Sequence, residues 1–365
     1  MCKKKKAALL RHDLIFSFIP AFCFMLSLSA MEPSKNIEQC GSKPSNISVK
    51  QDRDCGHFDV FANLIIWTAK EAGADCWAEI ITSDIFSSSN DLLEVNFGWD
   101  PGFKVGAGYK GGKSRWDTQT CYTWFHTKGS DDISGAPGTI HSTFLGNFYV
   151  DNIFGLGLSG PPYQKASIDW TIQFNIFDWE LGYDFSVSNA LSFRPFLGIK
   201  GGWINQSIDS KWVNPDLSNP DFFGAQPFNI GIESLKNNYW GIGPGAGVNT
   251  RWDLFRGESL FYLFGDFAGA MMWGHWSFND VYQNDINQQV TVDLQDINGG
   301  SSMFRTFMGF GWDTYWRQNR YRFSTKLGYE MQFWLDQLQF YSFTGGRLTN
   351  NLSLQGGTFE FCFDF

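Results

Sequence analysis

The sequence is short of charge and, beyond its first 30 residues, of long apolar runs. Charged residues make up 18% of the 365 positions, where about a quarter is usual. The stretch closest to a spanning helix, residues 260–276, contains Asp266, His275 and three glycines. Because a spanning helix needs about 20 consecutive apolar residues, and the mean hydropathy is only -0.23, a helical membrane protein is excluded.

A basic surface is also lacking. The formal net charge is -9, and residues 1–30 carry +4, which leaves -13 on the remainder of the chain. Proteins that bind nucleic acid need a basic face against the phosphates. A nucleic-acid partner is therefore excluded, whereas an acidic surface would favour cations if its charges lined a pore.

Motifs for catalysis, metals and cofactors are missing as well. The sequence has no CxxC or HExxH spacing for zinc and no GxSxG nucleophile elbow. Two segments match GxGxxG: residues 106–111 are followed by a further strand pattern, and residues 155–160 are followed by two prolines. A dinucleotide site instead needs the N-terminus of a helix at this position. We therefore expect no enzymatic activity, no bound metal and no cofactor.

Cysteine is present in an odd number once the N-terminal segment is set aside. An odd count in an exported protein leaves at least one thiol free or bonded to another chain. The alternative is that some cysteines are ordinary small residues of the fold. The candidates for disulfide bonds are Cys40, Cys55, Cys76, Cys121 and Cys362.

The N-terminal segment has the pattern of a secretory signal peptide. Lys3 to Lys6 form a basic region, an uncharged apolar run follows at residues 14–28, and Ser29 and Ala30 offer a cleavage site. An N-terminal anchor is the alternative, although the run is shorter than the roughly 18 residues that a spanning helix needs. We predict a cleaved signal peptide at residues 1–30 and an irregular periplasmic lead-in at residues 31–56.

Aromatic residues are abundant, at 18% of the chain, and they alternate with polar residues. Between residues 321 and 333, one parity is mostly aromatic and aliphatic, and the other carries Arg322, Lys326 and Glu330. Residues 166–176, 191–203 and 358–365 show the same contrast. Since successive side chains of a strand point to opposite faces, we predict strands with an apolar face toward lipid and a polar face toward a lumen.

Segment lengths and connections favour a membrane barrel over a soluble barrel or sandwich. The alternating segments run for about 10 residues or more, as tilted transmembrane strands do, and aromatic pairs such as Trp240 and Trp252 bracket them. Short connections alternate with long polar ones at residues 128–138, 207–236, 279–300 and 335–351. We predict an all-β fold: an antiparallel up-and-down transmembrane β-barrel over residues 57–365, with an even number of about 12–14 strands.

Function in such a barrel would lie on its polar face. An Arg or Lys that faces lipid costs about 2–4 kcal/mol at mid-bilayer, so the ionisable side chains of the strands should face water, where rings of charge set ion preference. The alternative is that they pair into a network that braces the wall and conducts nothing. The pore-lining candidates are Asp169, Arg194, Lys200, Arg322, Lys326 and Glu330.

Five stretches resemble the Legionella-type major outer membrane protein family of pore-forming barrels, which is also found in relatives of the chlamydiae. They are residues 59–67, 99–109, 178–183, 191–206 and 237–247, and LSFRPFLGIKGGWINQ at 191–206 is the most specific. The resemblance implies an outer-membrane, porin-like protein that is abundant at the cell surface, with adhesin or antigen as further roles. The cysteine usage, closer to that of the chlamydiae, implies disulfide-linked envelope partners.

Two functions are consistent with these features. The first is a porin-like channel of the outer membrane for passive diffusion of ions and small solutes, in contact with membrane lipid and compatible with a homo-oligomer. The second is a surface structural protein or adhesin with a closed or plugged barrel, which would bind an envelope partner or a host surface. A count of about 8–10 strands would favour the second, because small barrels fill with side chains.

The last strand pattern carries Phe361, Phe363 and Phe365 on one parity. We interpret this aromatic end as the signal that the outer-membrane assembly machinery reads.

Deleting Phe365 should therefore lower the amount of protein in the outer membrane and raise the amount of periplasmic aggregate. Cell fractionation followed by immunoblotting measures both. Unchanged assembly would contradict this interpretation of the terminus.

Overall fold

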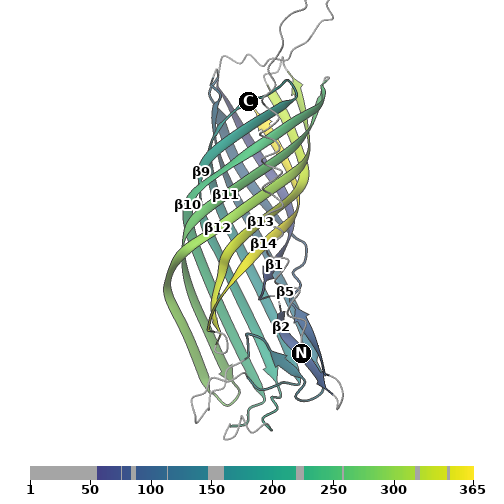
Figure 1. Cartoon of the computed structure of the whole chain (residues 1–365), viewed down its shortest axis with the longest axis vertical. Helices are drawn as coiled ribbons and strands as arrows, with labels where there is room; N and C mark the ends of the chain where they lie inside the picture. The colour runs from purple at the N-terminus through teal and green to yellow at the C-terminus, as the bar shows by residue number, and fades with distance from the viewer. Residues whose placement is uncertain are drawn as a thin grey trace, which may run out of the picture. The chain divides into compact units, whose positions relative to one another are not determined.

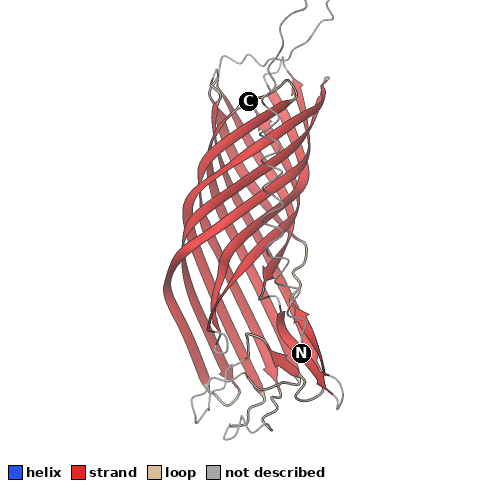
Figure 2. Ribbon diagram, viewed as in Figure 1, coloured by secondary structure: helices blue, strands red, loops and turns tan. Residues whose placement is uncertain are grey.

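The computed structural model describes residues 56–74, 76–83, 88–112, 114–146, 160–218, 226–256, 259–316, 321–342 and 346–365. Almost all of this is β-strand (Figure 2), and no helix within it is long and apolar enough to cross a membrane. The predicted signal peptide, the lead-in up to residue 55, and the cysteines Cys40 and Cys55 lie outside the described residues.

Ten long strands close into an antiparallel barrel (Figure 1). The order around the ring is β10-β11-β12-β13-β14-β1-β4-β5-β7-β9, and β9 pairs with β10 to close it. The strands are β1 His57–Ala72, β4 Asp100–Lys110, β5 Trp116–Ser134, β7 Lys165–Tyr183, β9 Leu191–Val213, β10 Ile230–Arg256, β11 Ser259–Asn284, β12 Gln289–Trp316, β13 Tyr321–Ser342 and β14 Gly346–Asp364.

Four short strands complete the fold. β8 (Phe185–Ser186) pairs with the start of β9. β2 (Cys76–Ser83), β3 (Ser88–Glu94) and β6 (Ile140–Ser142) form a separate three-stranded sheet in the order β3-β2-β6.

The antiparallel up-and-down barrel and its even strand number confirm the predicted fold class, but ten strands are fewer than the 12–14 predicted. The reason is strand length. β10, β11 and β12 contain 27, 26 and 28 residues, more than twice the roughly 9–11 that a strand needs to cross a bilayer. These three strands therefore use far more of the sequence than a membrane crossing requires.

The two ends of the barrel differ in their connections. At one end, the strands are joined through residues 111–115, 184–190, 257–258 and 317–320. Short turns are typical of the periplasmic end of a bacterial barrel, so we assign this end, near the label C in Figure 1, to the periplasm. The opposite end carries the three longest connections, at residues 73–99, 135–164 and 214–229, and we assign it to the extracellular side.

Two of the predicted long loops are in fact strands. Residues 279–300 form the tip of the β11–β12 hairpin, and residues 335–351 belong largely to β13 and β14. The predicted loops at 128–138 and 207–236 also shrink, because β5 runs to Ser134 and β9 to Val213. These segments are polar because they extend beyond the membrane, and polarity alone made them resemble loops.

Toward the periplasmic end, the wall is apolar outside and charged inside. On β9, Leu197, Ile199 and Trp203 face outward and are exposed, while Arg194 and Lys200 face inward. The exposed aromatic residues of the extracellular side of this band are Trp124, Trp203, Trp240, Trp273 and Phe333, and those of the periplasmic side are Phe58, Tyr109, Trp116, Trp252, Trp316 and Phe365. Such paired girdles mark the two interfaces of a membrane.

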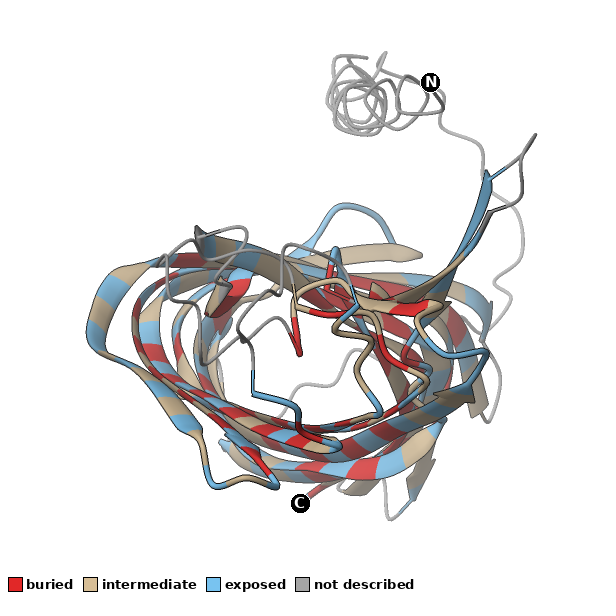
Figure 3. Ribbon diagram, turned by 90° about the horizontal axis from the view of Figure 1, so that it is seen from below, coloured by how far each residue is buried: buried red, intermediate tan, exposed pale blue. Residues whose placement is uncertain are grey.

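Toward the extracellular end, the same wall is polar outside and apolar inside. Ile168, Ile172 and Phe174 of β7 are fully or almost fully buried within the barrel, and Asp169 and Gln173 between them are exposed. β7 pairs with both neighbours without a register shift, so its parity never changes. The prediction that the apolar face of residues 166–176 contacts lipid is therefore wrong: above the membrane the outside is water, and apolar residues turn inward. The alternation of burial along the strands is visible in Figure 3.

The position of this boundary can be tested on β7 alone. Gln173→Lys and Trp179→Lys both change an outward residue, but only Trp179 lies in the apolar band. We expect Trp179→Lys to lower the free energy of unfolding in lipid vesicles by about 2–4 kcal/mol and Gln173→Lys to leave it within about 0.5 kcal/mol. Urea titration followed by tryptophan fluorescence gives both values, and equal costs would contradict the boundary.

Candidate functional site

The periplasmic half of the lumen contains a cavity of about 510 Å³. Its walls come from all ten barrel strands and are dominated by ionisable side chains. The lining includes His57, Lys110 and Asp184 at the periplasmic rim. At its inner end lie Lys104, Arg305 and Glu330. The cavity is thus a charged vestibule within the membrane band that extends from the periplasmic rim.

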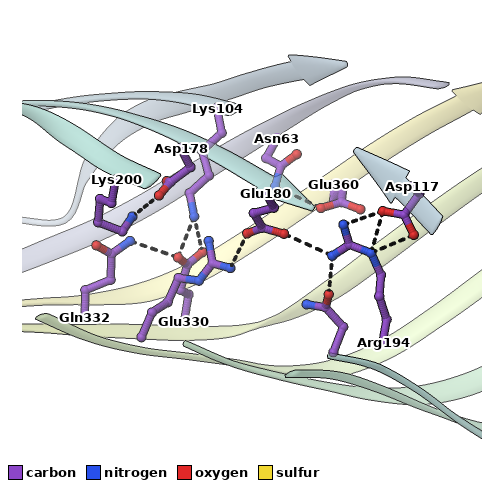
Figure 4. A network of polar contacts seen from close by, with 12 residues as sticks. Asn63, Lys104, Asp117, Asp178, Glu180, Arg194, Lys200, Glu330, Gln332 and Glu360 are labelled. Carbon is purple, nitrogen blue, oxygen red and sulfur yellow. Dashed lines mark hydrogen bonds and ion pairs between the residues drawn. The ribbon is translucent and has the colours of Figure 1, made fainter. Parts of the chain in front are cut away.

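A guanidinium group organises the outer part of this vestibule (Figure 4). Arg194 Nε lies 2.8 Å from Asp117 Oδ1, and its Nη1 lies 3.0 Å from Glu180 Oε2 and 2.7 Å from Asn249 Oδ1. These partners come from β5, β7 and β10. One planar group with five donors can satisfy several acceptors at once, so Arg194 ties three neighbouring parts of the wall together.

Deeper in the lumen, three ion pairs form a layer. Lys104 Nζ lies 2.6 Å from Glu330 Oε2, and Lys200 forms an ion pair with Asp178. The third pair joins Arg305 Nη2 to Glu180 Oε1 over 3.7 Å. β12 and β7, which carry this pair, are four places apart around the ring of ten, so the contact spans the lumen. The layer lies at the inner end of the vestibule.

Five of the six pore-lining candidates lie inside the barrel, and each is ion-paired. Besides Arg194, Lys200 and Glu330, Lys326 Nζ lies 3.0 Å from Glu360 Oε1, and Arg322 Nε lies 2.8 Å from Asp364 Oδ2. Asp169 is different: it lies on the outer surface, 2.9 Å from Lys128 Nζ. Its strand is above the membrane at this level, where the polar parity faces water outside the barrel.

Sequence reasoning missed four members of the charged layer: Lys104, Asp178, Glu180 and Arg305. The signal was present for three of them. Lys104 lies between the exposed Phe103 and Val105, and the two acidic residues alternate with Phe177, Trp179 and Leu181. The alternation was difficult to recognise because no clear turn separates the segment after residue 176 from the segment before it. The same parity is apolar up to Ile176 and acidic from Asp178 onward.

Above the charged layer the lumen is filled by a buried core. Phe174 of β7 and Trp334 of β13 are in edge-to-face contact with ring centroids 5.5 Å apart. These strands are five places apart in the ring of ten and therefore face each other across the barrel. The two rings therefore bring opposite walls of the barrel into direct contact across the lumen.

A buried amide also links opposite walls of the barrel. Gln206 of β9 donates from Nε2 to Glu71 Oε1 of β1 at 2.6 Å and to Gln337 Oε1 of β13 at 2.7 Å. Each partner strand is four places away from β9 around the ring. Trp170 Nε1 in turn donates to Gln206 Oε1 at 2.9 Å. Buried polar groups need such partners, and here the partners are on opposite walls.

The extracellular mouth contains a buried pair of carboxyl groups. Glu233 of β10 accepts a hydrogen bond from the Gly146 amide at 2.6 Å and lies beside Asp280 of β11. Both side chains are almost fully buried, seven residues beyond Trp240 and Trp273 of the girdle. Burial, with the neighbouring Asp280 as a second cause, raises the pKa of Glu233 well above its usual value, and burial raises the pKa of Asp280 to about 7.

The thiols within the barrel are arranged in one row of the sheet. Cys362 of β14 is opposite Phe61, Phe61 is opposite Gly106, and Gly106 is opposite Cys121 of β5. Since adjacent strands are about 4.8 Å apart, three steps separate the two cysteines by too much for a disulfide bond. Both line the vestibule and neither is in a disulfide. Cys76 lies in β2, outside the barrel ring.

The comparison with protein families decides the identity. The profile described as Legionella pneumophila major outer membrane protein precursor matches residues 53–365. The chain belongs to this family. The resemblance found in the sequence is confirmed, and with it the location in the outer membrane and the contact with membrane lipid that the apolar band requires. None of the curated proteins compared matches the sequence.

Solved barrels share only distant similarity with this family member. The outer membrane protease OmpT from Escherichia coli is 11% identical over 85% of this chain and 97% of its own, with a TM-score of 0.44. A Pseudomonas aeruginosa FadL homologue is 10% identical over 86% and 90%, with a TM-score of 0.28. A major outer membrane protein from Thermus thermophilus is 10% identical over 66% and 84%, with a TM-score of 0.26. At these values the similarity carries no information about function.

The carboxyl pair predicts a pH dependence of stability. The folded protein holds protons on Glu233 and Asp280 that the unfolded chain releases above about pH 4.5, so stability should be greatest in acid and fall as the pH rises toward and past 7. Thermal unfolding of the refolded protein, measured from about pH 5 to about pH 8, should give a falling midpoint for the wild type and a flatter profile for Asp280→Asn. Asp285→Asn, at an exposed turn nearby, is the control and should keep the wild-type slope. A wild-type slope in Asp280→Asn would contradict the assignment.

Proposed function

We propose that the barrel is closed to passive diffusion and serves as a non-catalytic surface protein of the outer membrane, an anchor that projects a structural or adhesive unit outside the cell. The observation that carries this proposal is the contact between Phe174 and Trp334 across the lumen. It lies directly above the charged layer, so that two different barriers follow each other along the axis.

Barrel size supports the same conclusion. About eight strands enclose a space that side chains fill, whereas porins with 16–18 strands enclose an aqueous channel. With ten strands, this barrel is near the narrow end of that range. The Arg305–Glu180 pair and the bonds of Gln206 reach from wall to wall, which a wider barrel would not permit.

The strands themselves support the anchoring role. β10 to β12 continue well beyond the aromatic girdle, and the part beyond it buries an apolar core of its own with a polar outer face. This is the organisation of a water-soluble unit. A channel would have no need for such an extension, whereas a protein that presents a surface to the outside does.

A porin-like channel for ions and small solutes is the second candidate. The vestibule of about 510 Å³ supports it, because it already extends through part of the membrane and is lined by charges of both signs. For conduction, however, the core around Phe174 and Trp334 would have to move away from the axis.

Single-channel recording in planar bilayers distinguishes the two candidates. We expect the refolded wild type to give no discrete conductance steps. The double variant Phe174→Ala, Trp334→Ala should give steps, because it removes the rings that meet across the lumen. The matched control is Trp179→Ala, Phe333→Ala, which removes exposed rings from the outer faces of the same two strands and should remain silent.

Folding is monitored by the heat-dependent shift of the barrel on gels, so that leakage from misfolded protein is not counted. Reproducible steps in the wild type would overturn the closed barrel and establish the channel. A folded but silent double variant would show that the charged layer alone seals the lumen, and the addition of Glu330→Gln would then be expected to open it.

A further inference from the structure

The small sheet at the extracellular end has one open edge. In the order β3-β2-β6, β2 is paired on both sides, and within the described residues no strand pairs with the outer side of β3. β3 runs from Ser88 to Glu94, and every residue in it except Leu93 is exposed. An exposed strand edge presents unpaired N–H and C=O groups to any chain that can align with it.

The hydrogen bonds of β2 show which groups of β3 point outward. The Ile81 amide donates to the Thr139 carbonyl on the β6 side at 3.0 Å. Ile81 is opposite Asn90 in the β2–β3 pairing. In an antiparallel pair, residues alternate between those bonded to the partner and those directed away from it. The backbone groups of Asn90, and of Leu92 two residues further on, are therefore directed to the open edge.

Within the described residues, this edge is protected only by two acidic side chains and by an irregularity at one end. Natural edge strands are blunted by lysine, proline, a bulge or a covering segment. β3 contains no lysine and no proline, and the irregularity in the β2–β3 pairing falls at its end, between Cys76 and Ala78 of β2. Leu92 is 58% exposed and would offer an apolar contact to a neighbouring strand.

The charge on this edge selects the partner. β3 carries Asp91 and Glu94 and no cation. Glu94 lies 3.7 Å from Lys70 Nζ, with both side chains more than half exposed, so the contact is weak. Pairing two copies of β3 would bring four acidic residues together without a cation on either strand, which is unfavourable between neighbouring strands. A basic strand would be attracted instead.

We propose that the outer edge of β3 binds an extended segment of another protein, in which basic residues alternate with apolar ones, as a fourth strand of the β3-β2-β6 sheet. Backbone bonds to Asn90 and Leu92 provide the alignment, and Asp91 and Glu94 provide the charge preference. This mode of recognition gives affinity through main-chain bonds and specificity through alternate side chains. The inference does not depend on whether the barrel conducts.

The test uses the full-length protein in a nonionic detergent and two short peptides as probes, one of alternating lysine and valine and one of alternating glutamate and valine. We expect the wild type to bind the lysine peptide with a Kd about ten-fold or more below that for the glutamate peptide. The double variant Asp91→Lys, Glu94→Lys should reverse the preference. Loss of the preference without reversal, or no binding of either peptide, would overturn the proposal.

A second variant separates strand addition from simple charge attraction. Asn90→Pro removes an N–H that is directed to the open edge and leaves the bonds to β2 in place, so it should weaken binding of the lysine peptide about ten-fold with both acidic residues retained. Unchanged binding would mean electrostatic adhesion only and would overturn strand addition. Sedimentation without peptide tests whether two copies of the chain pair through β3. A wild-type dimer that Asn90→Pro converts to a monomer would show such pairing and would overturn the proposal.

Discussion

The structure depends on the alternation of side chains along strands, and β7 keeps one parity from end to end. Such a strand has a single inner face, but its outer face meets lipid over one part of its length and water over the other. On β7, Trp179 faces lipid and Gln173 faces water, both on the outer side. The inner face has the reverse pattern. It is charged where the outer face contacts lipid and largely apolar where the outer face contacts water. One geometric rule thus produces both the vestibule and the core.

The sequence predicted correctly which side chains face inward where the outer face of the barrel contacts lipid. It was misleading where the outer face contacts water. Arg194, Lys200, Arg322, Lys326 and Glu330 were placed inside the barrel because aromatic and aliphatic neighbours surround them. Asp169 was misplaced because the alternation around it is equally regular, and a pattern of period two does not reveal which face is inside. The predicted strand number was too high for a different reason: polar strand extensions and loops have similar compositions. The contacts across the lumen join residues far apart in sequence, and no local pattern indicates them.

The inner charges brace the wall of the barrel. Taking charged groups out of water is costly unless they are paired with good geometry, and here the partners come from different strands, so the compensation itself links the walls. Arg194 links adjacent parts of the wall, whereas Arg305 and Gln206 link opposite parts. The barrel is narrow because it has ten strands, and its interior can be cross-linked because these strands bring opposite walls within reach of one another.

The seam between β1 and β14 has a consequence for the order of folding. Asn63 Nδ2 and Glu360 Oε2 are 3.1 Å apart yet 297 positions apart in sequence, and Phe58 and Phe365 exchange backbone hydrogen bonds. Closing a loop of this length costs chain entropy that only the finished seam repays. Lys104 and Glu330 are on opposite sides of this seam, so this pair of the charged layer forms only when the seam closes. Ring closure and neutralisation of Lys104 by Glu330 therefore occur in the same step.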